Sequence, residues 1–139
     1  MGFIEAVKFN FVHYGDFKGR AARSQYWWWF LFVVLTNAIF STIDSAAGWD
    51  IIQLPDMEGS TVPVEVSGIG PLASIWFIAL LLPNIAVAVR RLHDTGKSGW
   101  WFLLNLLCCI GSIILIIWYI LPGTKGENRF GPEPITEIL

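Results

Sequence analysis

The chain has 139 residues and a formal net charge of −2 at pH 7. Hydrophobic residues make up 55% of it and charged residues only 14%, whereas soluble domains carry about 25% charged residues. This composition argues against an ordinary soluble domain. The sequence also has no basic stripe and no recognisable nucleic-acid-binding module, so we expect no nucleic-acid partner.

The N-terminal segment, residues 1–25, precedes the first long apolar run. Within it, Phe3, Val7 and Phe11 recur at the spacing of one helix face, with charged residues between them. This pattern predicts an amphipathic helix over residues 3–13 that lies on the inner leaflet of a membrane. We therefore expect residues 1–25 to be cytoplasmic or interfacial.

Three apolar runs follow, at residues 26–43, 71–89 and 100–121, and none contains Asp, Glu, Lys, Arg or His. As helices they would be about 27 to 33 Å long, which matches a hydrocarbon core of about 30 Å. The sequence therefore predicts an all-α membrane protein with three transmembrane helices. Together with the interfacial helix they would form a single integral membrane domain over residues 1–139.

The charges that flank these runs predict their orientation. Lys and Arg occur before the first run, and the connection at residues 90–99 holds Arg90, Arg91 and Lys97. The segment at residues 44–70 contains acidic residues but no Lys or Arg. Because basic flanks stay inside, we expect a cytoplasmic N-terminus, a cytoplasmic 90–99 loop and an external acidic loop.

The tail, residues 122–139, does not fit three simple spans. Such spans would place it outside, although Lys125 and Arg129 are typical of a cytoplasmic segment. The "CCIGS" break in the third run would allow a kink or a re-entrant hairpin that returns the tail inside. Each limb would then be only about 15 Å long, and irregular backbone at that depth needs protein cover. We favour a full span, with the kinked or re-entrant run as the alternative.

The connection "RRLHDTGKSGWW", residues 90–101, is the first candidate site. It is not a phosphate-binding P-loop, because Arg91 stands where that motif needs glycine and an apolar helix precedes it. His93 and Asp94 are neighbours, but no nucleophile motif accompanies them. Two interpretations remain: a turn at a helix end, or a patch that attracts anionic lipid by about 1 kcal/mol per cation.

The segment "FKGRAARSQYWWW", residues 17–29, has a similar design. Arg20 and Arg23 stand just before three tryptophans, either as positive-inside anchors or as the second half of the same site. We expect the two segments to meet at one membrane face. The candidate binding residues for an anionic headgroup or partner are Arg20, Arg23, Arg90, Arg91, His93, Asp94, Lys97 and Arg129.

Polar residues within the apolar runs are few, and the notable ones are Asn37, Asn84 and Asn105. We predict a hydrogen bond between Asn84 and Asn105, worth about 0.6 kcal/mol. Helix packing is the plain interpretation, and a transport substrate site is the alternative. No ligand spacing predicts a metal site, and we predict neither catalytic residues nor a cofactor.

Three motifs, "FKGRAARSQYW", "RRLHDTGKSGWW" and "GENRFGPEP", occur in this order between the apolar runs. Together they resemble the YhaH-like family of bacterial inner-membrane proteins, catalogued as domain of unknown function 805. The resemblance runs from about Phe17 to Pro134 and implies a small bacterial inner-membrane protein. It supplies no catalytic residue and assigns no role to the matched positions, which are Gly19, Arg20, Arg23, Tyr26, Trp27, Arg91, His93, Asp94, Gly96, Trp100, Asn128, Arg129, Phe130 and Gly131.

We therefore interpret the chain as a non-enzymatic, multi-pass protein of the bacterial inner membrane. Its basic cytoplasmic face would bind membrane lipids through an anionic headgroup, or an acidic segment of a membrane protein partner. The alternative is a transporter or channel subunit, which would require a homo-oligomer because three spans are too few to enclose a pathway. An enzyme acting on lipid headgroups would need His93 and Asp94 as acid and base.

Overall fold

The computed structural model describes residues 1–49, 51 and 70–134, except for the side chain of Cys108. It divides the chain into two compact units. Unit 1 comprises Met1–Phe32 and Leu81–Leu139, and unit 2 comprises Val33–Leu80. Most of the predicted external loop at residues 44–70 lies outside the described residues, so that loop stays a prediction.

The predicted N-terminal helix is present as α1 (Phe3–Val12). At its start the Glu5 carboxylate accepts a hydrogen bond from the Gly2 amide at 2.9 Å. Asn10 is fully buried on the opposite side of the helix from solvent, and its side-chain oxygen accepts a hydrogen bond from Arg90 at 2.8 Å. Helix α1 is therefore anchored to the rest of unit 1 by a buried polar contact.

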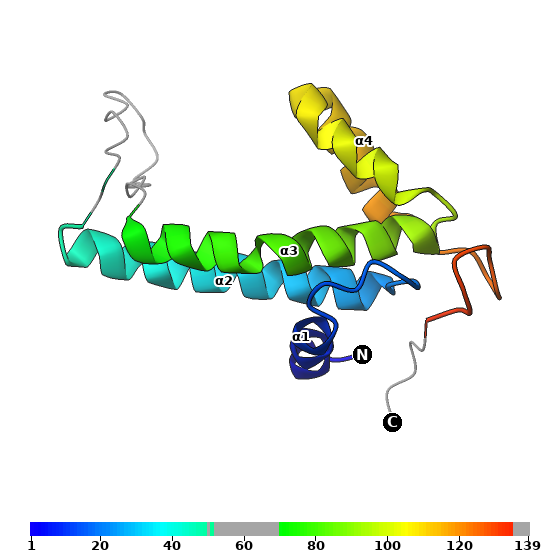
Figure 1. The fold of residues 1–139 in the computed structure, drawn as a ribbon, viewed down its shortest axis with the longest axis horizontal. Helices are drawn as coiled ribbons and strands as arrows, with labels where there is room; N and C mark the ends of the chain where they lie inside the picture. Colours follow the sequence, from blue (N-terminus) through cyan, green and yellow to red (C-terminus); the bar gives the residue numbers. More distant parts are fainter. Residues whose placement is uncertain (50, 52–69, 135–139) are drawn as a thin grey trace. The chain divides into compact units, whose positions relative to one another are not determined.

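The first two apolar runs form the long helices α2 (Arg23–Ala46) and α3 (Pro71–Asp94), each of 24 residues (Figure 1). Both are long and apolar enough to cross a membrane. Only 11% of the apolar window of α2 and 28% of that of α3 is buried within the protein. A core helix of a soluble protein would be mostly buried, so this exposure is what lipid-facing helices require.

In unit 2, the carboxylate of Asp44 forms the N-terminal cap of α3. It is fully buried and accepts hydrogen bonds from the amides of Leu72 at 3.2 Å and Ala73 at 2.8 Å. These amides belong to the first turn of α3, where backbone donors have no helical partner. A β-carbon on Gly70 would collide with the Asp44 side chain, so glycine is required beside this cap.

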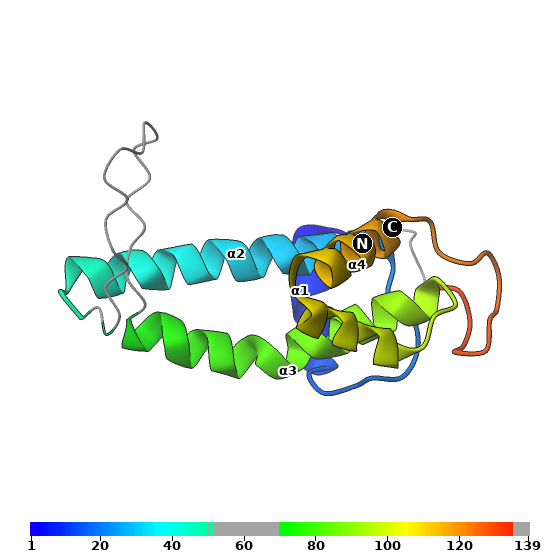
Figure 2. The ribbon, with the colours of Figure 1, turned by 90° about the horizontal axis from the view of Figure 1, so that it is seen from above.

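The third apolar run does not form one helix, so the three predicted transmembrane helices are not confirmed. It comprises a 3₁₀-helix, η1 (Gly99–Leu107), and the α-helix α4 (Cys108–Ile120). Figure 2 shows the two limbs side by side, and the rings of Trp101 and Trp118 pack edge to face at 5.5 Å. The run is a hairpin, as in the kinked or re-entrant alternative. We call it the η1/α4 hairpin.

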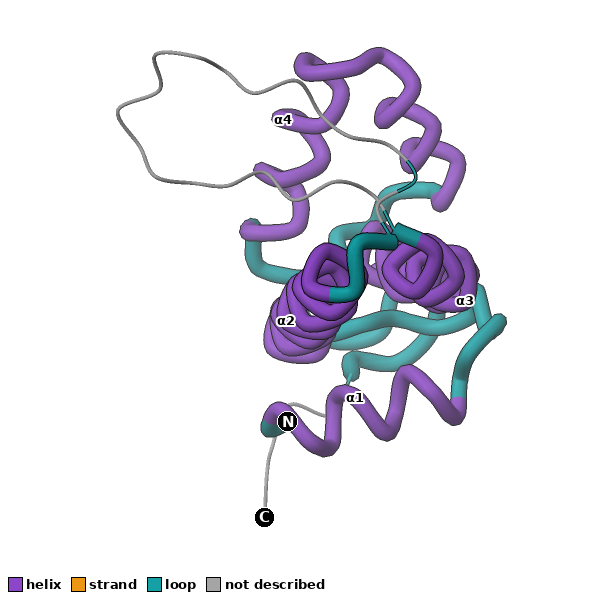
Figure 3. Tube along the Cα trace, turned by 90° about the vertical axis from the view of Figure 1, so that its left-hand side faces the viewer, coloured by secondary structure: helices purple, strands orange, loops and turns teal. Residues whose placement is uncertain are grey.

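A glycine makes the two limbs of the η1/α4 hairpin fit together. A β-carbon on Gly111 would overlap the backbone carbonyl of Leu104. On its other face, α4 buries Leu115 and Tyr119 against Ala88 and Leu92 of α3. Within unit 1, the hairpin and α1 therefore pack on different sides of the α2 and α3 segments (Figure 3).

Candidate functional site

Three charged side chains that the sequence singled out form a buried cluster, which we call the arginine clamp: Arg20, Arg91 and Asp94. The carboxylate of Asp94 lies 2.9 Å from Nη2 of Arg20 and also accepts a hydrogen bond from Nη1 of Arg91. The three side chains are 1%, 0% and 5% accessible. Charges buried this deeply persist only when ion pairing and hydrogen bonds compensate them.

Backbone carbonyls of the C-terminal tail supply that compensation for Arg20. Its guanidinium donates to the carbonyls of Thr124 and Gly126. The Thr124 amide donates in return to the backbone carbonyl of Asp94 at 2.8 Å. A β-carbon on Gly123 would collide with the Asp94 carboxylate. The tail is therefore seated directly on the end of α3.

Arg91 joins the same cluster to the hairpin. Its guanidinium donates to the carbonyls of Tyr119 at 3.2 Å and of Leu121, at the end of α4. It also donates to the Ala21 carbonyl at 3.2 Å. The last carbonyls of a helix carry partial negative charge and favour a nearby cation. Arg91 thus ties the returning limb of the hairpin to α3 and to the segment before α2.

His93, which belongs to the second motif, contacts the other two. Its Nδ1–H donates to the Gly19 carbonyl at 3.1 Å, and its own carbonyl accepts a hydrogen bond from Asn128 at 2.9 Å. Its ring stacks on Phe130 with centroids 4.0 Å apart and planes 4° from parallel. Within the described residues, His93 and Asp94 thus use their polar groups on different partners and form no hydrogen-bonded dyad.

The environment of His93 favours the neutral imidazole. The residue lies beyond the uncharged run at 71–89. Burial lowers the pKa of His93 below its ordinary value, the hydrogen bond to Gly19 opposes this, and the charge of Arg129 lowers the pKa further. At neutral pH the ring is therefore an uncharged stacking surface rather than a cation.

The remaining predicted cations divide by accessibility. Arg90 is buried, donates to Asn10, and holds its guanidinium 5.5 Å from the ring of Phe9; it anchors α1. Three others remain at the surface, and we call them the basic rim: Arg23, Lys97 and Arg129. Arg23 and Arg129 are exposed and Lys97 is half-buried.

Two cations of the basic rim have contacts within or beside the connection at residues 90–99. Arg129 donates to the carbonyl of Gly96 at 3.3 Å, which places it beside the residue before Lys97. The ammonium group of Lys97 lies 4.6 Å from the centre of the Trp118 ring. The negative face of the indole ring attracts this cation, so Lys97 is held at the Trp118 ring.

The polar residues of the apolar runs have partners other than those predicted. Asn84 accepts a hydrogen bond from the Trp29 indole at 2.7 Å, and Asn105 accepts one from Ser112 at 3.3 Å. The predicted bond between Asn84 and Asn105 is therefore wrong. Asn37 donates to the carbonyl of Val33 in its own helix at 3.0 Å. Each of the three therefore has a hydrogen-bond partner within the protein.

The comparison with known proteins agrees with the motifs. A family model described as "Protein of unknown function (DUF805)" matches residues 14–132. Inner membrane protein YhaH of Escherichia coli (strain K12) is 38% identical over 125 residues, covering 90% of this chain and 92% of that protein. Inner membrane protein YhaI of the same strain is 34% identical over 122 residues, covering 88% of each.

A third relative, "Uncharacterized protein YiiR" of Escherichia coli (strain K12), is 31% identical over 126 residues, which cover 89% of this chain and 72% of that protein. No solved structure matches the chain. The matched region contains the arginine clamp, the η1/α4 hairpin and the basic rim. The chain therefore belongs to the DUF805 family, whose relatives include named inner membrane proteins, and its long apolar helices suit that setting.

Proposed function

We propose that this protein is a non-enzymatic, multi-pass inner-membrane protein whose basic rim binds the anionic headgroup of a membrane lipid at the cytoplasmic surface. The observation that carries the proposal is that Lys97 of the basic rim lies on the ring of Trp118, which packs on Trp101. Trp100 and Trp101 are 79% and 49% exposed. Tryptophan prefers the headgroup level of a bilayer. Each cation at that level adds about 1 kcal/mol of attraction to anionic lipid.

The arginine clamp strengthens the attraction of the basic rim for anions. It holds two guanidinium groups against one carboxylate, so it carries excess positive charge. The field of that charge adds to the attraction of the basic rim for anions. The donors of the clamp are already used by Asp94 and backbone carbonyls. We therefore assign headgroup contacts to the basic rim and a supporting role to Arg20, Arg90, Arg91 and Asp94.

The proposal implies a topology of two spans and one re-entrant hairpin. The apolar runs of α2 and α3, residues 26–43 and 71–89, would cross the bilayer, with the acidic loop outside and the basic segments inside, as the positive-inside rule expects. The hairpin limbs, nine and 13 residues long, extend about 18 to 20 Å, less than the core of about 30 Å.

The hairpin would therefore enter from the cytoplasmic side and return to it. At its tip, Leu106 and Ile110 are 77% and 73% exposed, which suits contact with lipid tails. The N-terminus, the 90–99 loop and the tail would then share the cytoplasmic surface. This places Lys125 and Arg129 where the positive-inside rule expects them.

Lipid retention tests the headgroup site. The protein would be extracted into detergent, mixed with equal amounts of phosphatidylglycerol and phosphatidylcholine, and examined by native mass spectrometry. We expect the wild type to retain mainly phosphatidylglycerol. Two lost cations correspond to about 2 kcal/mol, so Lys97→Gln with Arg129→Gln should weaken this preference by about 30-fold.

The matched control is Lys8→Gln, which removes a positive charge from the exposed side of α1. It should leave the preference within a factor of two. Equal retention of the two lipids by the wild type, or an unchanged preference in the basic-rim double variant, would overturn the proposed function.

A further inference from the structure

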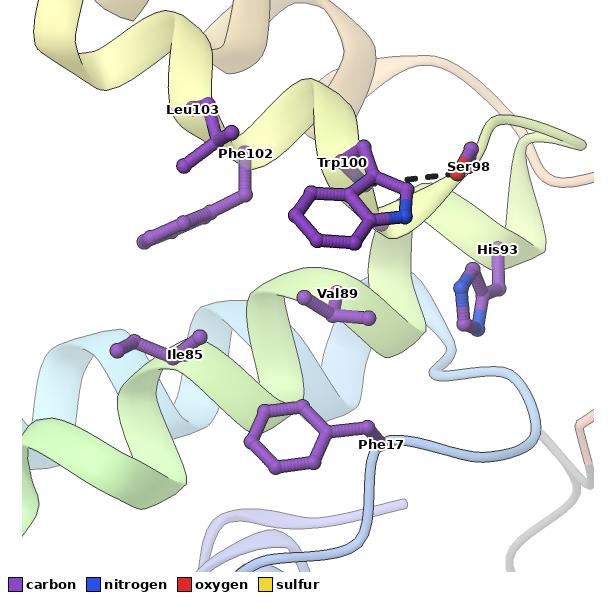
Figure 4. Close-up of a pocket in the computed structure, with 9 residues that line it drawn as sticks. Phe17, Ile85, Val89, His93, Ser98, Trp100, Phe102 and Leu103 are labelled. Atoms are coloured by element: carbon purple, nitrogen blue, oxygen red, sulfur yellow. Dashed lines mark hydrogen bonds between the residues drawn. The ribbon is translucent and has the colours of Figure 1, made fainter.

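A cavity of about 450 Å³ lies between the end of α3 and the 3₁₀-helix η1, within unit 1 (Figure 4). Most of its wall is apolar, formed by Ile85 and Val89 of α3, Phe102 and Leu103 of η1, and Phe17. Its volume falls within the range of about 300 to 1,000 Å³ that small-molecule pockets occupy. The cavity is therefore suited to a hydrocarbon ligand.

One end of this cavity is polar. His93 and Ser98 line it there (Figure 4), and the His93 ring stacks on Phe130. Phe130 in turn packs against the guanidinium of Arg129, 4.6 Å from its ring centre. The polar end, which we call the mouth of the cavity, thus holds the His93 ring and the Ser98 hydroxyl. The Phe130 ring lies between His93 and the cation of Arg129.

The polar end is also closely packed. A β-carbon on Gly99 would meet Val89 at 2.6 Å and Nε2 of His93 at 3.4 Å. This glycine therefore lets η1 begin directly against α3. Trp100 borders the same end and is largely exposed, so a molecule in the surrounding lipid can reach the cavity from the side.

We propose that this cavity holds one acyl chain of the anionic phospholipid whose headgroup binds the basic rim. The inference rests on the proposed function and specifies its ligand. The chain would lie along Ile85, Phe102 and Leu103, with the phosphate at the His93 end beside Arg129. The charge of Arg129, which reaches the His93 end through Phe130, favours an anion, and the apolar wall selects a ligand with a hydrocarbon chain rather than free phosphate.

The surrounding bilayer determines which measurement can detect selective binding of the acyl chain. A lipid chain gains little hydrophobic free energy on leaving the bilayer for a protein groove, because lipid tails are as apolar as leucine. The cavity therefore orients the lipid in the membrane. It slows loss of the lipid once detergent replaces the bilayer, so retention after extraction is the informative measurement.

The experiment compares four probes on the full-length protein in detergent: dioleoyl phosphatidylglycerol, dioctanoyl phosphatidylglycerol, glycerol phosphate and inorganic phosphate. We expect the dioleoyl lipid to be retained at least tenfold more than the dioctanoyl lipid, and the two phosphates to bind weakly. The cavity-filling variant Ile85→Trp should reduce retention of the dioleoyl lipid about tenfold. Ile78→Trp, at an exposed position of α3 in unit 2, is the control.

A second measurement does not depend on a variant that folds. Phosphatidylglycerol with a photoreactive group midway along one chain would be cross-linked to the wild type and mapped by mass spectrometry. We expect adducts on peptides that contain Ile85, Phe102 or Leu103. Adducts confined to other peptides, such as those of α2, would overturn the cavity assignment.

The outcomes separate this inference from the proposed function. If headgroup preference depends on the basic rim but Ile85→Trp retains the dioleoyl lipid as the wild type does, only the cavity assignment fails. If inorganic phosphate binds as tightly as the dioleoyl lipid, the site is a phosphate site and the acyl-chain inference fails. If charge variants of the basic rim change nothing for any probe, the proposed function fails.

Discussion

Arg20 and Asp94 stand 74 positions apart in the chain and form a buried ion pair with a nitrogen-to-oxygen distance of 2.9 Å. Arg91 shares the same carboxylate. Between them the two arginines also bind carbonyls of the tail and of the end of α4. One cluster thus gathers the segment before α2, the end of α3 and the chain that follows the hairpin.

The first prediction concerns the carboxylate of the arginine clamp. Replacing Asp94 by asparagine leaves two buried guanidinium groups without a counter-charge. Removing one member of a buried ion pair typically costs about 3 to 5 kcal/mol. We expect Asp94→Asn to lower the free energy of unfolding by that amount, measured by denaturant titration in detergent.

The control for this variant is Glu127→Gln, which removes a carboxylate charge from an exposed position of the same tail. Substitutions of exposed residues usually change stability by less than about 0.5 kcal/mol. An Asp94→Asn protein as stable as Glu127→Gln would show that the arginine clamp does not hold the tail.

The second prediction concerns the contact between the two limbs of the hairpin. In Gly111→Ala the new methyl group would overlap the Leu104 carbonyl, so the two limbs must separate. Overpacking of this kind costs about 1 to 3 kcal/mol, and we expect a fall of that size in the free energy of unfolding. Cys109→Ala, at an exposed position two residues earlier, should have little effect, and equal stability of the two variants would argue against the close contact of the limbs.

The third prediction is a pH dependence that arises from His93. Its pKa is lowered in the folded protein, chiefly by burial, so the unfolded chain takes up a proton first as the pH falls. Stability from this group is therefore fully present above the unfolded value of about 6.5 and decreases as the pH falls below it. We expect the free energy of unfolding to decrease between pH 7.5 and pH 5.5.

The variant His93→Asn isolates this contribution. Its amide can donate to the Gly19 carbonyl as Nδ1 of His93 does, but it does not titrate. The unfolding free energy of the wild type minus that of the variant should therefore increase as the pH rises from 5.5 to 7.5. A difference that stays constant from pH 5.5 to pH 7.5 would contradict the assignment.

The two long helices could be predicted from the sequence because their signal is local. An uncharged run of sufficient length determines a helix such as α2 or α3 without reference to the rest of the chain. The third run has the same composition, yet it reverses. Hydropathy measures the length of an apolar run but not the contact between Gly111 and the Leu104 carbonyl, which depends on the path of the backbone.

The sequence could predict which residues form the candidate site, but not how those residues are arranged. The motifs single out Arg20, Arg91 and Asp94, and the structure brings these three together. Their burial could not be foreseen, because the groups that compensate the arginines are mainly backbone carbonyls, which every residue has. The cap of α3 by Asp44 was missed for a related reason, since the amides it binds lie 28 and 29 positions away.

The arginine clamp and the hairpin together predict that the tail emerges on the same side of the membrane as the segment before α2. Full-length protein with green fluorescent protein fused at the C-terminus would be compared with the same chain fused to alkaline phosphatase. A sandwich fusion after Ile51, in the predicted external loop, calibrates the opposite side. We predict a fluorescent, phosphatase-inactive C-terminus and an active phosphatase after Ile51. An active phosphatase at the C-terminus would place the tail outside and contradict the re-entrant hairpin and the shared cytoplasmic site.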